Sequence, residues 1–334
     1  RGGFLLRKLV IAAMICALLL CGTGVPVFAA AEHVLVFGHV QPTDHPYHLM
    51  AEKFKQELEA LSGGRVQVEI HPGGSLGNER DLVEGLKLGT VDVSTITSAL
   101  TATFVREFGV FSLPFLFESF EQMYKVMDSP VGDEFAAYLE REGLVKLGFN
   151  SGGARSMYAS KPVNSLEDLQ KMKIRTMEDP VYVETWNNLG ALATPLPWGD
   201  VYTALDTGMV DGAEGAMISY KSMGFYDPAP YITVINYIFS WHNFMMSKTA
   251  LEKLPEDLQA MVLTAGKRAQ DYQRALVVEE EKSLLDVLEK EHGCTVIYPK
   301  DLAVWREKAM PVYEKRAAEL GGMELIERIQ KAGQ

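Results

Sequence analysis

The segment DLVEGLKLGTVDV, residues 81–93, has a counterpart in DVYTALDTGMVDG, residues 200–212, and this pair predicts how the chain is built. In each segment a helical pattern ends at a glycine, and a strand pattern follows at once. The matched positions are Asp81/Asp200, Leu86/Leu205, Gly89/Gly208, Val91/Val210 and Asp92/Asp211. Either the match reflects a connector common to helix–glycine–strand junctions, or it marks one unit repeated in two lobes of similar topology.

Strand and helix patterns alternate on both sides of the first segment. Residues 33–40, 65–71 and 91–97 have strand patterns, and amphipathic helical patterns lie between them. This order is typical of an α/β protein with helices on the faces of parallel sheets. About 300 residues exceed a usual single core, so we expect two lobes. The first comprises 32–153 plus about 241–280, and the second 154–240 plus about 281–334.

One long helical pattern runs from Pro255 to His292. At about 1.5 Å per residue such a helix is longer than a single lobe. We therefore expect a long C-terminal helix that spans both lobes, with Gly266 as the candidate position for a bend.

The first residues have the features of a secretory signal peptide, predicted at 1–31. Basic residues precede an apolar run at 9–20, an alanine-rich stretch follows, and cleavage after Ala29 or Ala31 fits the pattern. Cys21 raises lipidation as an alternative, although a large leucine precedes it. The prediction places the mature chain in the periplasm.

Charge and cysteine content exclude several classes of protein. The formal net charge is −12, which disfavours nucleic-acid binding because an acidic chain repels phosphate. Of three cysteines, Cys16 and Cys21 lie in the signal peptide and only Cys294 remains, which excludes an internal disulfide framework and a cysteine-rich metal site.

Two patterns raise other functions. GGSLG, residues 73–77, matches the nucleophile elbow of a serine hydrolase with Ser75 as the nucleophile, but no oxyanion motif precedes it and the later histidines lack a triad signature. His39, His45, His48 and His71 cluster near the start, which raises a zinc-binding carrier, yet they form no recognisable ligand pattern. We expect no metal, no cofactor and no enzymatic activity.

Two arginines occupy positions where we expect a negatively charged partner. Arg155 follows Gly152-Gly153, and Arg175 lies in the predicted strand KIRT. Arg175 could form a structural ion pair with Glu178 or Asp179. Alternatively, its guanidinium could hold a ligand carboxylate through two parallel hydrogen bonds, which lysine cannot reproduce.

Several separated motifs occur in the order and spacing of one known family. They include GGSLGNERDLVEGLKLGTVDV, FGVFSLPFLF, KPVNSLEDLQKMKIRT, LGALATPLPWGDVYTALDTGMVDGAEG, GFYDPAPYI and LPEDLQ. The chain resembles the DctP-type solute-binding proteins of tripartite ATP-independent periplasmic transporters. The resemblance implies a hinged, two-lobed periplasmic binding protein fold that closes on an organic acid and delivers it to membrane permease subunits. It makes GGSLG a structural loop, and we expect a monomer.

The resemblance also suggests site residues. It implies that Arg175 clamps a carboxylate, that Arg155 assists, and that Trp198 lies against the ligand. With the neighbouring polar and aromatic positions, the candidate ligand-binding residues are Arg175, Arg155, Trp198, Gly215, Glu79, Thr97, Glu214, Tyr237, Trp241 and His39.

Gly215 departs from the family pattern, which often has asparagine at that position. Glycine would leave room beside the ligand, while Trp198, Tyr237, Phe239 and Trp241 would offer apolar surface, unless these aromatics belong to the core. We therefore expect a bulkier acid than a C4-dicarboxylate, such as an aromatic or branched 2-oxo or 2-hydroxy acid.

Overall fold

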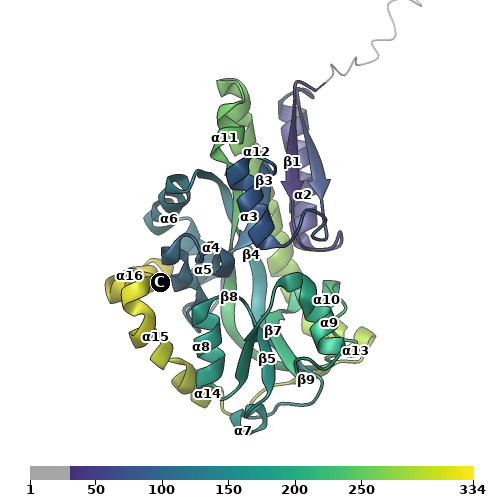
Figure 1. Ribbon diagram of the computed structural model, residues 1–334, viewed down its shortest axis with the longest axis vertical. Helices are drawn as coiled ribbons and strands as arrows, with labels where there is room; N and C mark the ends of the chain where they lie inside the picture. The colour runs from purple at the N-terminus through teal and green to yellow at the C-terminus, as the bar shows by residue number, and fades with distance from the viewer. Residues whose placement is uncertain (1–30) are drawn as a thin grey trace, which may run out of the picture.

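The computed structural model describes residues 31–334, and its centre is a nine-stranded mixed sheet (Figure 1). The predicted signal peptide and Cys21 fall almost entirely in residues 1–30 and lie outside the described residues. The strand order is β2-β1-β3-β8-β4-β7-β5-β6, and β9 pairs with β8. The strands are β1 (His33–Gly38), β2 (Val66–His71), β3 (Val93–Thr97), β4 (Leu144–Ala159), β5 (Lys173–Thr176), β6 (Leu192–Pro195), β7 (Gly212–Ala216), β8 (Tyr231–Ser247) and β9 (Thr295–Ile297).

The sheet contains the same βαβαβ unit twice. In the first unit α2 (Pro46–Leu61) and α3 (Glu79–Leu88) connect the parallel strands β1, β2 and β3. In the second unit α8 (Pro180–Asn188) and α9 (Val201–Asp206) connect the parallel strands β5, β6 and β7. The spatial orders β2-β1-β3 and β6-β5-β7 are equivalent. The match between residues 81–93 and 200–212 therefore marks a repeated structural unit.

The matched aspartates have the same structural role in both units. Gly89 and Gly208 follow their helices in the left-handed conformation, at φ 78° and φ 69°, where a glycine is unstrained. Asp92 then accepts a hydrogen bond from the backbone N–H of Val36 through its carboxylate, at 2.8 Å. Asp211 accepts from the N–H of Lys173 at 2.8 Å. Each carboxylate thus ties the start of the third strand to the first strand of its unit.

The long antiparallel strands β4 and β8 connect the two units. The C-terminal end of β8 pairs with β3. The C-terminal end of β4, at the opposite end of the β4–β8 ladder, pairs with β7. Between these ends the β4–β8 register shifts at Ser151/Ala154 and again at Arg155/Met157. Such irregularities interrupt the hydrogen-bonded ladder and bend the strands at this point.

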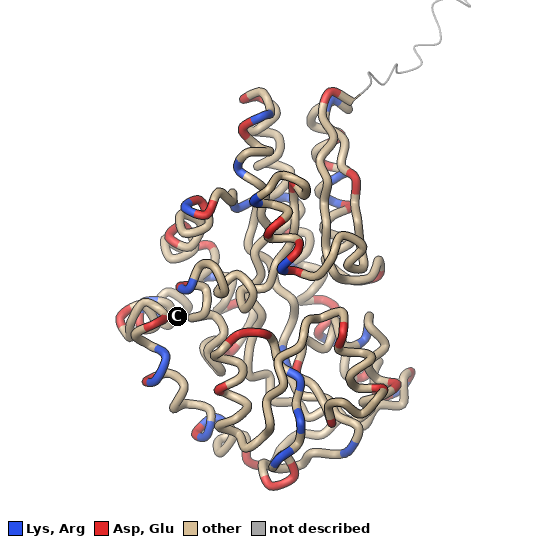
Figure 2. Tube along the Cα trace, viewed as in Figure 1, with Lys and Arg blue, Asp and Glu red and all other residues tan. Residues whose placement is uncertain are grey.

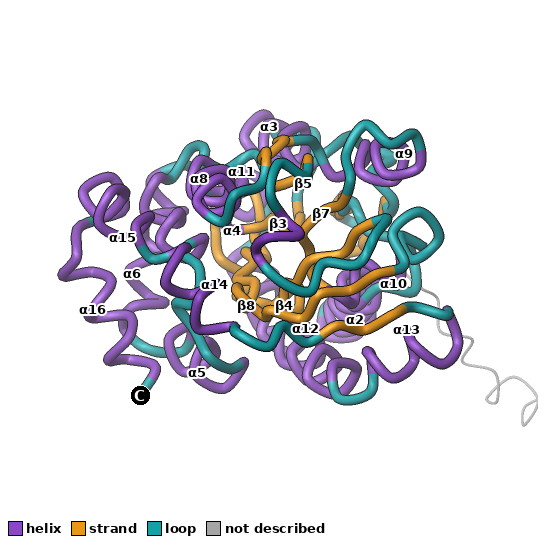
Figure 3. Tube along the Cα trace, turned by 90° about the horizontal axis from the view of Figure 1, so that it is seen from below, coloured by secondary structure: helices purple, strands orange, loops and turns teal. Residues whose placement is uncertain are grey.

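Helices flank the strands, which occupy the middle of the molecule in Figure 3. The helices outside the two units are α4 (Ser98–Thr101), α5 (Phe120–Met127), α6 (Pro130–Arg141), α7 (Leu166–Leu169), α10 (Met217–Ser222), α11 (Lys248–Glu252), α12 (Glu256–Glu281), α13 (Leu284–His292), α14 (Leu302–Ala309), α15 (Pro311–Arg316) and α16 (Gly322–Gly333), with 3-10 turns η1 (Arg106–Ser112), η2 (Trp198–Asp200) and η3 (Ala317–Leu320).

The long C-terminal helix is present, but it ends earlier than the pattern predicted. α12 has 26 residues, or about 39 Å at 1.5 Å per residue. The chain then forms a turn at Lys282 and Ser283, and α13 starts after it. The break in the helix therefore lies at this turn and not at Gly266. Leu258 of α12 packs in the core beneath β1, whereas Val277 packs in the core beside β7. The helix therefore runs along both halves of the sheet (Figure 1).

The C-terminal helices also contact both halves. Trp305 of α14 lies in the core beside α8, whereas Ile326 and Ile329 of α16 lie in the core around α5 and α6. Acidic and basic residues are intermixed along the trace of the described residues (Figure 2). Within residues 31–334, none of the helices combines the length and apolar character needed to cross a bilayer.

Candidate functional site

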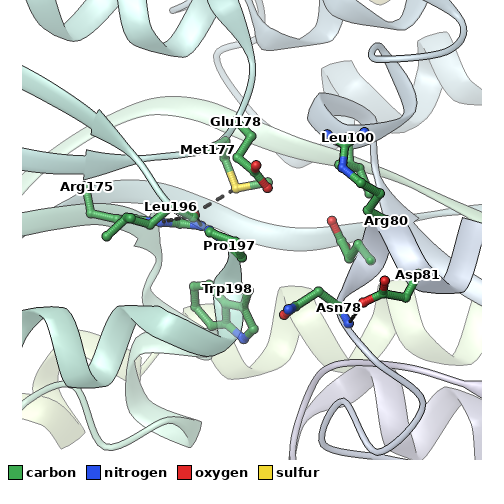
Figure 4. Close-up of a pocket in the computed structure, with 11 residues that line it drawn as sticks. Asn78, Arg80, Asp81, Leu100, Arg175, Met177, Glu178, Leu196, Pro197 and Trp198 are labelled. Atoms are coloured by element: carbon green, nitrogen blue, oxygen red, sulfur yellow. Dashed lines mark hydrogen bonds between the residues drawn. The ribbon is translucent and has the colours of Figure 1, made fainter.

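A cleft lies where the carboxyl ends of β1, β3, β5 and β7 meet. In open α/β sheets the carboxyl ends of the strands are the usual place for a ligand. Figure 4 shows Arg175 and Trp198 on one side of the cleft and Asn78, Arg80 and Asp81, at the start of α3, on the other. The two βαβαβ units therefore contribute opposite walls.

The cleft has an outer and an inner compartment that share three lining residues, Glu79, Met177 and Trp198. The outer compartment encloses about 720 Å³ of empty space, including its open mouth. Its other lining residues are Asn78, Arg80, Asp81, Leu100, Arg175, Glu178, Leu196 and Pro197. The inner compartment is further lined by Val40, Gln41, Thr97, Arg155, Ala216, Ser219 and His242.

Hydrogen bonds join the two walls. The Gly199 N–H donates to Asn78 Oδ1 at 3.3 Å near the outer compartment. Gln41 Nε2 donates to Ser219 Oγ at 3.4 Å, and His45 Nε2 lies 3.0 Å from the same oxygen. The cleft is thus nearly closed, with its polar groups turned toward one another.

Arg175 is a buried cation with no carboxylate partner among the described residues. Its side chain is 1% exposed at the end of β5. Its Nε and Nη2 donate to the carbonyl oxygen of Leu196 at 3.0 and 2.6 Å, and its guanidinium lies 5.6 Å from the Trp198 ring. Burial lowers the pKa of this guanidinium, because the nearby carboxylates compensate only partly for lost hydration. The alternative ion pair with Glu178 or Asp179 is not formed.

Asp179 is engaged elsewhere. Its carboxylate accepts from Ser112 Oγ at 2.7 Å and from the Val181 N–H at 2.7 Å, which caps α8. Burial raises its pKa to about 6.

Arg155, by contrast, is fully paired inside the protein. Its Nε and Nη2 donate to the two carboxylate oxygens of Glu214 at 2.8 and 2.7 Å. The hydroxyl of Tyr237 also donates to Glu214, at 2.5 Å. Burial is the largest single influence and opposes the charge on Arg155, but Glu214, Tyr182 and Tyr237 together outweigh it and raise the pKa well above its usual value. Glu214 thus holds Arg155 in place, and only Arg155 of this group lines the cleft.

Glu79 and Thr97 form the acidic side of the cleft. Glu79 begins α3, and its carboxylate accepts from the Thr97 N–H at 3.0 Å and from Thr97 Oγ1 at 2.7 Å. Burial raises the pKa of Glu79 to about 6, against the effect of these hydrogen bonds. The raised pKa makes this carboxyl group easier to protonate than an exposed one.

The aromatic residues expected around the ligand separate into two groups. Trp198 lines both compartments, and its buried Nε1 has no hydrogen-bond partner in the described chain. Trp241 stacks on Phe111 at 3.9 Å within the core. Tyr237 and Phe239 also belong to core clusters and do not line the cleft. The apolar surface on which the expectation of an aromatic acid rested is therefore reduced to one tryptophan.

Gly215 and His39 also lie beside the cleft without lining it. A Cβ atom at Gly215 would lie 3.0 Å from the hydroxyl of Tyr158, so the space that this glycine leaves is already filled. His39 is 1% exposed, and its Nε2 lies 3.2 Å from His48 Nδ1. Its carbonyl oxygen accepts from the Gly74 N–H, which anchors the GGSLG turn to β1.

Ser75 lies on an exposed turn, where Gly73 and Gly74 have positive φ angles. Among residues 31–334 no hydrogen bond joins its hydroxyl to a histidine. The described residues also contain no group of three or more His, Cys, Asp and Glu side chains placed to bind a metal ion.

Sequence analysis missed several polar residues of the inner compartment, among them Gln41, Ser219 and His242. His242 lies in β8 opposite Thr97, and its Nε2 lies 3.3 Å from the Tyr47 hydroxyl. Burial lowers its pKa to about 3, so its imidazole is neutral. A polar residue just after β1 and a histidine within an apolar strand were the available signals for Gln41 and His242.

Comparisons with known proteins agree with this geometry. A family model described as "Bacterial extracellular solute-binding protein, family 7" matches residues 37–320. The 2,3-diketo-L-gulonate-binding periplasmic protein of Escherichia coli is 29% identical, over 81% of this chain and 83% of its own. The sugar acid binding protein of Advenella mimigardefordensis, solved with galactonate, is 28% identical at a TM-score of 0.87, covering 91% and 99% of the two chains. A periplasmic solute-binding protein of Bradyrhizobium, solved with galacturonate, is 36% identical at a TM-score of 0.84, covering 89% and 99%.

Proposed function

The chain belongs to the bacterial extracellular solute-binding protein family 7, and we propose that it captures a hydroxylated sugar acid, an aldonate or a uronate. The observation that carries this proposal is Arg175, a buried guanidinium that no carboxylate of the described chain neutralises. Removing one partner of a buried ion pair leaves an expensive, unpaired charge. A ligand carboxylate at Arg175 supplies the missing partner and fixes its own orientation through two parallel hydrogen bonds.

The polar atoms around the cleft favour a ligand with several hydroxyl groups. Gln41 Oε1, Trp198 Nε1 and His242 Nδ1 are buried and lack hydrogen-bond partners within the described residues. Buried polar groups are normally paired, and a polyhydroxylated ligand can pair such atoms as donor or acceptor. Similar proteins bind galactonate, galacturonate or 2,3-diketo-L-gulonate. A flat aromatic acid would leave these atoms unpaired.

Binding closes the two lobes by a hinge in β4 and β8. Residues 32–153 with about 241–280 form one moving body, and residues 154–240 form the other. The tail from 281 contacts both, because α14 packs against α8 whereas α16 packs among α5 and α6. The register shifts near Arg155 support this location, since they place the weakest part of the ladder beside the site.

The acid is then delivered to the membrane subunits of a tripartite ATP-independent transporter. The protein acts in the periplasm as a binding protein with no enzymatic step. Ser75 lies on an exposed turn away from the cleft lining, which supports a role without a nucleophile.

A ligand screen tests this function. Purified protein is unfolded, and its released small molecules are identified by mass spectrometry. In parallel, its melting temperature is measured with D-galactonate, D-galacturonate, galactitol, succinate and phenylpyruvate. We expect the sugar acids to raise it most, since a ligand at about 100 times its dissociation constant adds roughly 2.7 kcal/mol. A larger shift with phenylpyruvate, or an equal shift with the uncharged galactitol, would contradict the proposal.

A further inference from the structure

Tyr158 carries an unpaired hydroxyl group beside Arg175. Its side chain is fully buried, and its hydroxyl oxygen has no hydrogen-bond partner among the described residues. A buried hydroxyl without a partner is destabilising, and most such groups are paired in native proteins. The neighbouring Tyr220 illustrates the usual case, because its hydroxyl donates to the carbonyl oxygen of Ala229 at 2.9 Å.

The sheet register places Tyr158 and Arg175 on the same face. Ala213 of β7 pairs with Tyr158 on one side and with Arg175 on the other. Residues paired directly across a sheet point their side chains to the same face. The small methyl group of Ala213 lies between them, so nothing bulky on β7 separates the tyrosine from the guanidinium.

Gly215 has no side chain that would compete with Tyr158 for space. It follows Ala213 by two positions and therefore shares its face, one row nearer the carboxyl end of β7. A Cβ atom there would lie 3.0 Å from the Tyr158 hydroxyl and 3.3 Å from a ring carbon. The hydroxyl thus occupies the place where any larger residue at 215 would put its side chain.

Aromatic packing fixes the ring in this position. Tyr158 stacks on Phe225 at 5.7 Å, Phe225 contacts Trp198 at 5.2 Å, and Trp198 lies against Arg175. Burial raises the pKa of the Tyr158 hydroxyl, which keeps it protonated and able to donate. These contacts connect Tyr158, which lines neither compartment itself, to the lining residues Trp198 and Arg175, so a free donor lies beside the cation of the cleft.

We propose that the Tyr158 hydroxyl donates a hydrogen bond to the ligand carboxylate held by Arg175, and that glycine at 215 is required for this contact. Arg175 supplies charge and two donors, while Tyr158 supplies a third donor from the opposite side of Ala213. This inference rests on the proposed function, since it needs an acid in the cleft.

The test uses calorimetry with D-galactonate and thermal unfolding of the ligand-free protein. We expect Tyr158→Phe to bind about 10- to 100-fold more weakly, the effect of losing a hydrogen bond to a charged group. Its ligand-free melting temperature should be unchanged or higher, because an unpaired buried hydroxyl is removed. Tyr220→Phe is the matched control: it leaves the Ala229 carbonyl without its donor, so it should melt earlier and bind normally.

Gly215→Ala provides a second arm. Gly215 has no left-handed φ angle, so its backbone accepts alanine, but the added methyl displaces the tyrosine hydroxyl. We expect weaker binding in the wild-type background and a much smaller further loss in the Tyr158→Phe background.

Binding of Tyr158→Phe within twofold of the wild type would overturn the inference while leaving the proposed function intact. A loss of affinity that only parallels a lower melting temperature would also overturn it, because that is the signature of a structural role. If the unmodified protein binds neither D-galactonate nor D-galacturonate, the proposed function fails and the inference fails with it.

Discussion

The two βαβαβ units of this chain share a scaffold and differ in the chemistry at their carboxyl ends. Asp92 and Asp211 tie equivalent strands together in the same way. The first unit presents Glu79, a carboxyl group held by Thr97, whereas the second presents the cation Arg175, and Arg155 of the adjoining strand β4 lines the same cleft. The matched positions stabilise the same strand arrangement in both units, whereas the residues that line the cleft differ between the units. An acid is therefore anchored by one unit and enclosed by the other.

Two arginines of the cleft also contrast with each other, Arg175 of β5 in the second unit and Arg155 of the adjoining strand β4. Arg155 is neutralised within the protein by Glu214, whereas Arg175 contacts the carbonyl oxygen of Leu196, the sulfur of Met177 and the Trp198 ring, none of which carries a negative charge. The difference teaches that burial alone does not identify a ligand-binding arginine. The absence of an internal carboxylate partner within the described chain is the distinguishing observation.

The largest expected effect is on stability, from breaking the internal pair. Glu214→Ala leaves Arg155 buried without its carboxylate and should lower the free energy of unfolding by about 3–5 kcal/mol. Urea unfolding of the ligand-free protein measures this. Arg175→Ala is the control and should lower it by about 1 kcal/mol or less. Equal losses in the two variants would remove the contrast between the arginines.

Binding should show the reverse order. Arg175→Ala should weaken D-galactonate binding by about 2–5 kcal/mol, because the ligand carboxylate loses its buried partner. Glu79→Gln, which changes the opposite wall without removing a hydrogen-bonding group, should change affinity far less. Calorimetry of both variants checks this, and a larger loss from Glu79→Gln would place the anchor in the first unit.

The matched aspartates test whether the two scaffolds are equivalent in energy. Asp92→Ala should lower the free energy of unfolding by about 1–2 kcal/mol, and Asp211→Ala by less than about 1 kcal/mol. The reason is exposure, since water can replace the lost acceptor at Lys173 more easily than at Val36. Chemical denaturation decides the order. A larger loss at Asp211 would show that the second connection is the more important one.

The smallest expected effect is a dependence of stability on pH. Glu79 has a raised pKa of about 6 against 4.5 when unfolded, so its contribution is complete below 4.5 and is lost as the pH rises through 6. His242 has a lowered pKa of about 3 against 6.5, so its contribution is complete above 6.5 and is lost as the pH falls toward 3. Denaturation is measured between pH 4 and 7.5, and the free energy of unfolding is plotted against pH. Glu79→Gln and His242→Gln should change the slope of this plot in opposite directions. Parallel slopes would contradict both assignments.

Local patterns predicted much of the scaffold. The glycine after each helix and the aspartate three residues later mark the repeat, because helix ends and strand starts depend on nearby residues. The break at Lys282 and Ser283 was missed, since a helical pattern continues on both sides of it.

The site was predicted less completely, because partners that are distant in sequence decide it. Arg175 could be identified from a charged residue in an apolar strand. That Glu214 is occupied by Arg155, and that Tyr158 fills the space beside Gly215, depends on the pairing of β4 with β7. Likewise, Trp241 enters the core because it meets Phe111 from another part of the chain.

The central claim is that Arg175 is held free of internal carboxylates so that it can clamp the carboxylate of the ligand through two donors. Calorimetry of Arg175→Lys with D-galactonate tests this most directly, because lysine keeps the charge and loses the paired geometry. The account predicts at least about a 30-fold loss of affinity, equivalent to the lower end of a broken buried charge pair. It also predicts an unchanged circular dichroism spectrum. Affinity within a few-fold of the wild type in a folded Arg175→Lys protein would contradict it.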